Sequence, residues 1–248
     1  MHSDSVGQER GGDQRRDENR VRDLAETTWG EVRRERAILC LRFTSGERLV
    51  ESARAAARGG LRVVELTLTT PGALEAMAEL SKAHGQDRQN PGHQGELLVG
   101  GGTVLTRDDV EAVAAAGGRF ALSPVFDPDV IAAARECGLL AIPGAATPTE
   151  IHAAWRSGAR AVKVFPSGAL GGPAFLRAVR GPLPQVPLIP TSGPTAATAA
   201  DYLAAGAVAV GVGGVEFFPS GFTQEHVEDA ARRVRVAIDA AVSSMPTI

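Results

Sequence analysis

The stretch "LRVVELTLTTPGALEAMAELSK" (residues 61–82) contains one strand and one helix in immediate succession. Within 61–68 the side chains alternate between two faces, and the even-numbered residues of 64–68 are apolar, whereas Glu65 points to the opposite face. Residues 71–83 then show the apolar spacing of an amphipathic helix. A strand followed directly by a helix is typical of a βα unit, so this stretch predicts an α/β fold.

The same pairing repeats along the chain, because short runs rich in Val, Ile and Leu alternate with longer Ala-, Glu- and Arg-rich stretches. The predicted strands are 37–42, 61–68, 96–101, 119–123, 139–142, 160–165, 186–190 and 207–212. The predicted helical stretches include 46–58, 71–83, 106–116, 127–137, 147–157, 194–205 and 223–241, with a loop insertion at 85–95. Eight strands, each followed by a helix, predict a (β/α)8 barrel of the TIM type.

The beginning of the chain differs in composition from the rest. Residues 1–29 are charged and nearly free of apolar periodicity, so we expect a disordered extension there and a single barrel domain over 30–248. An amphipathic stretch near 24–36 fits either a short helix that closes the bottom of the barrel or irregular structure.

The composition favours a cytoplasmic protein that acts on a small molecule. A formal net charge of −3 without a dense basic patch argues against nucleic acid, and no apolar run is long enough to span a membrane. The two cysteines, Cys40 and Cys137, are isolated and no signal-peptide run precedes them, which favours a reducing compartment. The histidines lack metal-ligand spacing, and the glycine run at 99–105 lacks nucleotide-binding spacing, so neither a metal nor another cofactor is expected.

Lysine is rare in this chain. Of the 26 Lys and Arg residues only Lys82 and Lys163 are lysines, and Lys163 lies in the apolar run "RAVKVFP" (160–166). Side-chain alternation places Lys163 on the inner face of its strand. Unlike arginine, a lysine in apolar surroundings can lose its proton, attack a carbonyl carbon and form a Schiff base. The alternative is a structural lysine that extends to solvent or meets a carboxylate.

Polar side chains from four predicted strands share the same interior. Glu65 and Lys163 point inward, Arg42 shares a face with Cys40, and Thr103 follows the end of strand 96–101. Unpaired buried charges are costly, and the carboxyl ends of barrel strands are the usual place for chemistry, so we favour a functional role. The structural alternative is an ion pair between Glu65 and Lys163 with Arg42 at the rim.

Glycine-containing segments follow the last two predicted strands, "PTSGPT" (190–195) and "GVGGVEF" (211–217). Loops at these places in such barrels frequently present backbone N–H groups to a phosphate. The alternative is that these glycines only allow tight turns. The candidates for binding a phosphate, or the distal end of a substrate, are Thr191, Ser192, Gly193, Gly213 and Gly214.

Eight ordered segments together resemble a known family. Besides the two glycine-containing segments they are "LRFTSGE" (41–47), "VVELTLTTPGAL" (63–74), "VGGGTVLT" (99–106), "LSPVFDP" (122–128), "IPGAATPTE" (142–150) and "VKVFPSGALGG" (162–172). From about Ile38 to Val215 the chain resembles the class I aldolases that act on 2-keto-3-deoxy-6-phosphogluconate (KDPG) and 4-hydroxy-2-oxoglutarate (KHG).

The resemblance implies a role for each matching residue. It implies that Lys163 forms an imine with pyruvate, that Glu65 moves protons, that Arg42 and Thr103 hold the carboxylate of a 2-oxo acid, and that Pro124 and Phe165 form a pocket wall. It also implies a homotrimer and a place in carbohydrate metabolism of the Entner–Doudoroff type.

Two positions and one short segment depart from the family pattern. Thr69 stands where many members have an arginine, Val215 stands where the phosphogluconate-type enzymes have a phosphate-binding serine, and "TSG" replaces the usual "TGG". These departures leave open an unphosphorylated acceptor aldehyde, or a non-catalytic barrel that binds a sugar-acid phosphate. A phosphosugar epimerase is disfavoured, because the usual metal-binding histidines are missing.

Overall fold

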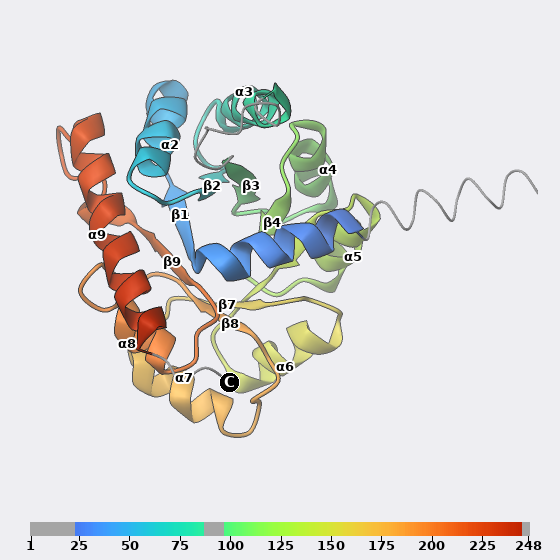
Figure 1. The fold of residues 1–248 in the computed structure, drawn as a ribbon. Coiled ribbons are helices and arrows are strands. Elements are labelled where there is room, and N and C mark those ends of the chain that lie inside the picture. Colours follow the sequence, from blue (N-terminus) through green and yellow to red (C-terminus); the bar gives the residue numbers. More distant parts are fainter. Residues whose placement is uncertain (1–22, 87–96, 245–248) are drawn as a thin grey trace, which may run out of the picture.

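A computed structural model of the chain describes residues 23–86 and 97–244, in which parallel strands alternate with helices that surround them (Figure 1). The strands are β1 (Ala37–Leu41), β2 (Val63–Thr67), β3 (Leu98–Gly102), β4 (Phe120–Leu122), β5 (Leu140–Ile142), β6 (Gly144–Ala145), β7 (Val162–Val164), β8 (Leu188–Pro190) and β9 (Val210–Gly213). The helices are α2 (Leu49–Arg58), α3 (Ala73–Gln86), α4 (Arg107–Ala115), α5 (Pro128–Glu136), α6 (Pro148–Arg156), α7 (Gly172–Arg180), α8 (Ala199–Ala204) and α9 (Gln224–Ser243). Two short 3-10 helices, η1 (Gly46–Arg48) and η3 (Gly214–Glu216), follow β1 and β9.

The strands close into a barrel in two hydrogen-bonded groups, β5-β4-β3-β2-β1-β9 and β6-β7-β8. Pro143 separates β5 from β6 because proline has no N–H to donate to a neighbouring strand, so these two pieces form one strand of the barrel. On the other side, Val208 N donates to Leu188 O over 3.0 Å and Thr191 pairs with Gly211, which joins β8 to β9. The predicted (β/α)8 barrel is therefore confirmed.

The faces of the strands agree with the alternation read from the sequence. Side chains that point to the barrel axis form a buried interior cluster, whereas Val64, Val162 and Val164 belong to the larger layer between sheet and helices. The members of the interior cluster are Val32, Ile38, Val63, Leu98, Phe120, Leu122, Leu140, Ile142, Ala161, Ile189 and Ala209.

Two helical predictions differ from the structure. Helix α7 was not among the predicted helices. It begins after Gly171, whose φ of 106° lies in the left-handed region. The glycine and proline residues at its start obscure its apolar periodicity. The predicted helix 194–205 is reduced to α8, because Thr195 N donates to Thr198 Oγ1 over 3.0 Å and holds 195–198 as a turn.

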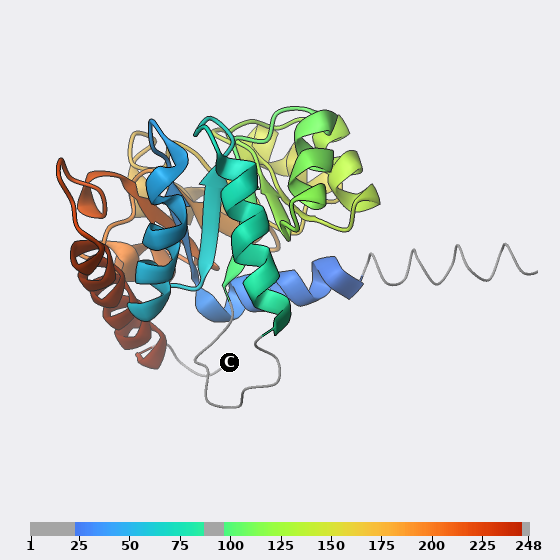
Figure 2. The same cartoon turned by 90° about the horizontal axis from the view of Figure 1, so that it is seen from above.

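The first described helix, residues 23–35, lies across one end of the barrel beneath the strands (Figure 2). Its Val32 belongs to the interior cluster, and Arg119, just before β4, donates to Thr28 Oγ1 over 3.2 Å. Glu26 forms an ion pair with Arg160, just before β7. The helix therefore covers the amino-terminal end of the strands, and the expected domain boundary at residue 30 falls inside it.

Parts of two predictions fall on residues outside the described ranges. These parts are residues 1–22 of the expected extension and residues 87–95 of the expected loop insertion.

Candidate active site

Lys163 lies at the centre of β7 with its side chain on the inner face. Its Cα neighbours in the sheet are Gly144 of β6 and Ile189 of β8, and only 4% of the residue is exposed. Its Nζ lies 5.1 Å from the centroid of the Phe165 ring. A buried lysine beside an aromatic ring is a candidate nucleophile rather than a surface cation.

Glu65 on β2 is the second buried charged residue of the interior, with 1% exposed. Its Oε1 is buried and has no hydrogen-bond partner among the described residues. Unpartnered buried polar atoms are rare in folded proteins and frequently mark function. The free Oε1 is therefore available to a substrate group or a water molecule.

The ion pair considered as a structural alternative is absent. Among residues 23–86 and 97–244, no contact of 4.0 Å or less joins the Glu65 carboxylate to the Lys163 ammonium group. Neither buried charge is therefore neutralised by an ion pair with the other.

Gly102 makes room for the Glu65 carboxylate. A Cβ atom at Gly102 would lie 2.5 Å from Cδ of Glu65, which is well inside van der Waals contact. The glycine run at 99–105 contains Gly102, but its spacing alone predicted no role for this residue. The signal was present, because glycines inside a strand often mark a close approach of another group.

Cys40 is a further interior residue that the sequence analysis did not assign to the site. It is the in-register neighbour of Glu65 across β1 and β2. Burial and the charge of Glu65 raise the pKa of the Cys40 thiol above its usual range, while Lys163 and Arg42 act in the opposite direction. The thiol is therefore within electrostatic reach of all three charged residues and stays protonated at neutral pH.

Arg42 and Thr103 meet at the carboxyl ends of β1 and β3. The exposed Arg42 donates from Nη2 to Thr103 Oγ1 over 3.3 Å. Continued alternation along β3 would send Thr103 toward the helices, but its φ of 58° lies in the left-handed region and ends the strand. The predicted pair is thus brought together by a backbone conformation that strand alternation does not predict.

The predicted wall residues lie next to the lysine. Phe165 is half-buried and directly follows β7. The backbone around Pro124 lies close to β6, because a Cβ atom at Gly144 would lie 2.8 Å from Ser123 O. Gly144 is in turn the sheet neighbour of Lys163. Both residues therefore border the carboxyl end of β7.

The candidate distal residues gather after β8 and β9. Thr191 is 9% exposed and pairs with Gly211, while Ser192 is exposed with a φ of 61°. Gly193 and Gly214 are also exposed, and Gly214 has a φ of 68°.

The two departing positions, Thr69 and Val215, follow β2 and β9, the strands on either side of β1. Val215 is 81% exposed and has no polar group to offer a phosphate. Thr69 donates to Thr67 Oγ1 over 3.3 Å. Neither side chain supplies the positive charge or the hydroxyl that the resemblance expects at its position.

The described ranges show neither a metal-binding cluster nor a membrane-spanning helix. The described ranges contain no group of three or more His, Cys, Asp or Glu residues placed to hold a metal ion. In the same ranges, no helix combines the length and the apolar character needed to cross a bilayer.

Residues 30–234 match a family model described as KDPG and KHG aldolase. The chain belongs to this aldolase family. An aldolase from Treponema pallidum, named 2-dehydro-3-deoxy-phosphogluconate aldolase, is 35% identical over 72% of this chain and 80% of its own length. A probable 2-dehydro-3-deoxy-6-phosphogalactonate aldolase from Rhizobium meliloti is 38% identical over 58% of this chain and 67% of its own.

A solved family structure has the same barrel. The KDPG aldolase of Legionella pneumophila, captured with pyruvate as a covalent carbinolamine intermediate, superposes with a TM-score of 0.70 at 29% identity. The match covers 80% of this chain and 93% of that one. The chain is thus an aldolase of the KDPG and KHG type, and relatives with different named substrates are similar to it at comparable identity.

Proposed function

We propose that this aldolase cleaves a KDPG-like 4-hydroxy-2-oxo acid to pyruvate and an aldehyde through an imine on Lys163. The aldehyde is glyceraldehyde 3-phosphate or glyoxylate, depending on the substrate. The observation that carries the proposal is a lysine that is 4% exposed on the inner face of β7, in a chain that otherwise uses arginine almost throughout.

The chemistry starts at the amine. The lone pair of Lys163 Nζ attacks C2 of the 2-oxo acid, and the carbinolamine loses water to give a protonated imine. Cleavage of the C3–C4 bond sends its electron pair into this imine and leaves an enamine of pyruvate. The C4 hydroxyl loses its proton and becomes the aldehyde carbonyl. Protonation of the enamine at C3 and hydrolysis then release pyruvate and the free amine.

Glu65 is the proposed proton carrier. Its buried, unpartnered Oε1 can accept the C4 hydroxyl proton, directly or through a water molecule, and return a proton to C3. Arg42 and Thr103 are proposed to bind the substrate carboxylate, because a guanidinium and a hydroxyl that already touch can share one anion. Pro124 and Phe165 complete the apolar wall. No step requires a metal ion, because the imine accepts the electron pair.

Borohydride trapping tests the proposal. Reduction in the presence of pyruvate, followed by peptide mass spectrometry, should find a stable adduct on Lys163. Lys163→Arg should abolish the adduct and lower turnover by more than about a thousandfold while the protein stays folded, because a guanidinium cannot act as the nucleophile. Lys82→Arg is the matched control, since Lys82 is exposed on α3 and should leave both readouts unchanged. A folded wild type without any adduct would favour the non-catalytic binding barrel instead.

A second candidate function keeps the imine chemistry but uses an unphosphorylated acceptor aldehyde. The observation that favours it is the exposed Val215, whose side chain offers no hydroxyl to a phosphate at that position. A comparison of kcat/KM for phosphorylated and unphosphorylated 4-hydroxy-2-oxo acids distinguishes the two.

The remaining family properties are also proposals for this chain. We propose a homotrimer in the cytoplasm, with a role in Entner–Doudoroff-type carbohydrate metabolism. Sedimentation equilibrium measures the first of these properties directly.

A further inference from the structure

Glu216, the last residue of η3, joins the loop after β9 to the loop after β8. Its carboxylate accepts from the backbone N–H of Ala196 through both oxygens, at 3.1 Å for Oε1 and 3.3 Å for Oε2. The side chain is half-buried, so this charge-assisted hydrogen bond is partly shielded from water.

No other hydrogen bond joins these two loops in the described part of the chain. Between residues 191–198 and residues 213–223, the hydrogen bonds of Glu216 with Ala196 are the only ones among the described residues. Thr191 and Gly211 also pair, but this pairing belongs to the sheet and lies before the two loops begin. Beyond that point Glu216 alone hydrogen-bonds the two loops within the described residues, while Ser192 O of the loop after β8 also accepts from Gly168 N over 2.9 Å.

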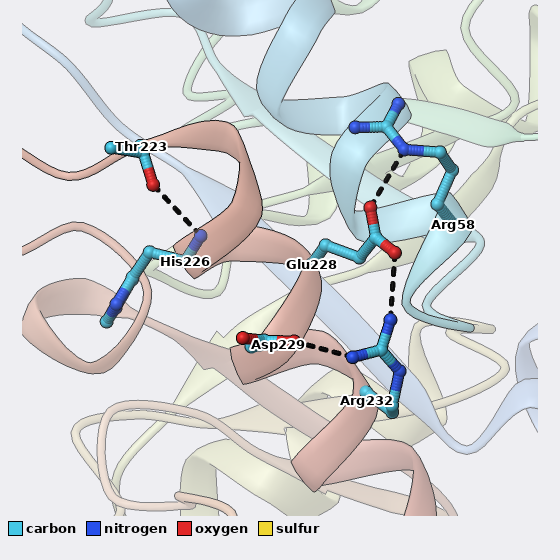
Figure 3. A network of polar contacts seen from close by, with 6 residues as sticks. All are labelled: Arg58, Thr223, His226, Glu228, Asp229 and Arg232. Carbon is cyan, nitrogen blue, oxygen red and sulfur yellow. Dashed lines mark hydrogen bonds and ion pairs between the residues drawn. The ribbon is translucent and has the colours of Figure 1, made fainter.

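A second contact fixes Glu216 from the side of α9. The Nε2 atom of His226 lies 3.0 Å from the backbone oxygen of Glu216. His226 itself lies in the first turn of α9, where its backbone N–H donates to Thr223 Oγ1 over 3.2 Å (Figure 3). The amino-terminal cap of α9 therefore holds η3 in place, and η3 in turn holds the loop after β8.

The candidate distal residues lie in the loops that Glu216 joins or directly before them. Ser192 and Gly193 precede Ala196 in one loop, and Gly213 and Gly214 directly precede Val215 and Glu216 in the other. Without the Glu216 carboxylate, the loop after β9 loses its hydrogen bonds to the loop after β8, whose Ser192 stays bonded to Gly168 N. Gly214 can then move away from Ser192 and Gly193, whereas Lys163 and Glu65 on β7 and β2 keep their positions.

We infer that Glu216 is a positioning residue that sets the width of the subsite for the aldehyde end of the substrate. This inference rests on the proposed function, because it assumes that the loops after β8 and β9 bind that end. Glu216 does not touch the reacting atoms. It acts through the backbone of the two loops, so its loss weakens binding of long substrates and leaves the pyruvate half of the reaction intact.

The test separates the two halves of the substrate. Glu216→Ala should raise KM for a six-carbon 4-hydroxy-2-oxo acid about tenfold with little change in kcat, because the lost contact stabilises the ground state and the transition state alike. A four-carbon 4-hydroxy-2-oxo acid, which yields formaldehyde and does not reach the loops, should keep its KM within about twofold. Borohydride trapping of pyruvate on Lys163 should also be unchanged.

Two further variants make the test specific. Glu216→Gln keeps one acceptor oxygen for Ala196 N, so it should restore KM to within about threefold of the wild type. Glu228→Gln is the matched control, since Glu228 lies on α9 but pairs with Arg58 and Arg232 away from the loops (Figure 3). It should leave both KM values unchanged.

The outcomes keep the inference and the proposed function apart. A wild type without a pyruvate adduct would overturn the proposed function. With the adduct present, an unchanged KM for the long substrate in Glu216→Ala overturns the inference alone. An equal rise in KM for the long and short substrates would also overturn it, because the effect would then be general rather than distal.

Discussion

Gly102 and Glu65 face one another across β3 and β2, in a part of the interior where an added carbon atom has no space. The Glu65 carboxylate occupies the position that a side chain at Gly102 would take, with Cδ 2.5 Å from the missing Cβ. The carboxylate is 1% exposed, so it cannot escape into solvent when it is displaced. The absence of a side chain at Gly102 thus determines the position of the Glu65 carboxylate, the proposed proton carrier.

Gly102→Ala should therefore damage catalysis more than stability. Overpacking of this kind typically costs about 1–3 kcal/mol, and a displaced proton carrier should lower kcat at least about tenfold. The measurements are kcat for a 4-hydroxy-2-oxo acid and the free energy of unfolding in urea. Gly30→Ala is the matched control, because it lies in the helix 23–35 with no atom near its added Cβ, and it should stabilise by roughly 0.5–1 kcal/mol without changing kcat. A wild-type kcat in Gly102→Ala would contradict this account.

At the scale of single residues, strand alternation predicted part of the interior. It placed Glu65 and Lys163 inside because both lie within regular strands, where period two holds. Thr103 was also expected in the interior, but alternation does not account for it, because Thr103 shares the parity of the helix-facing Val99 and only its left-handed φ brings it to Arg42. Alternation gave no role to Cys40, because a thiol beside a carboxylate on the next strand is a long-range contact.

Among the helices, α6 has a complete amino-terminal capping box. Thr147 Oγ1 accepts from Glu150 N over 3.3 Å, and the Glu150 carboxylate accepts in return from Thr147 N over 2.9 Å. The N–H groups of Ala146 and Thr147 and the Thr147 hydroxyl lower the pKa of Glu150 below its usual value. Because α6 connects β6 to β7, this cap stabilises the segment that precedes Lys163.

Thr147→Ala should cost about 1 kcal/mol of unfolding free energy at pH 7, as the loss of such caps usually does. Thr149→Ala, two residues further along the same turn and exposed, is the control and should be close to neutral. The lowered pKa of Glu150 gives a pH dependence, because its contribution is present above its unfolded pKa and is lost as pH falls through the folded value. Unfolding curves from pH 7 to pH 3 measure both effects, and equal losses in the two threonine variants would argue against the cap.

At the scale of whole elements, the sequence located strands better than helix ends. Strands of this barrel are continuous apolar runs, so all eight were found, but Pro143 divides one of them and only the proline itself signalled this. The helix α7 and the shortened α8 were missed for local reasons, since Gly171, Pro173 and the Thr195–Thr198 contact override the periodicity of their surroundings.

For the molecule as a whole, the two ends of the barrel have separate tasks. Arg42, Thr103 and the distal loops lie at the carboxyl ends of the strands, whereas the helix 23–35 covers the amino ends and reaches the interior through Val32. The interior cluster between them is apolar and buried. The sequence suggested this closing helix only as one of two possibilities, because a short amphipathic stretch does not reveal what it packs against.

Val32→Ala should therefore lower stability without lowering activity. Val32 is 0% exposed at the bottom of the interior cluster, so removing two methyl groups there should cost about 2 kcal/mol in transferred area and cavity formation. Val236→Ala on α9 is the matched control, since that valine is 63% exposed and should change the unfolding free energy by less than about 0.5 kcal/mol. Both variants should keep the wild-type kcat at 25 °C, because neither touches the carboxyl ends of the strands. A drop in kcat for Val32→Ala, measured where the variant is fully folded, would show that the closing helix also supports the chemistry at the opposite end.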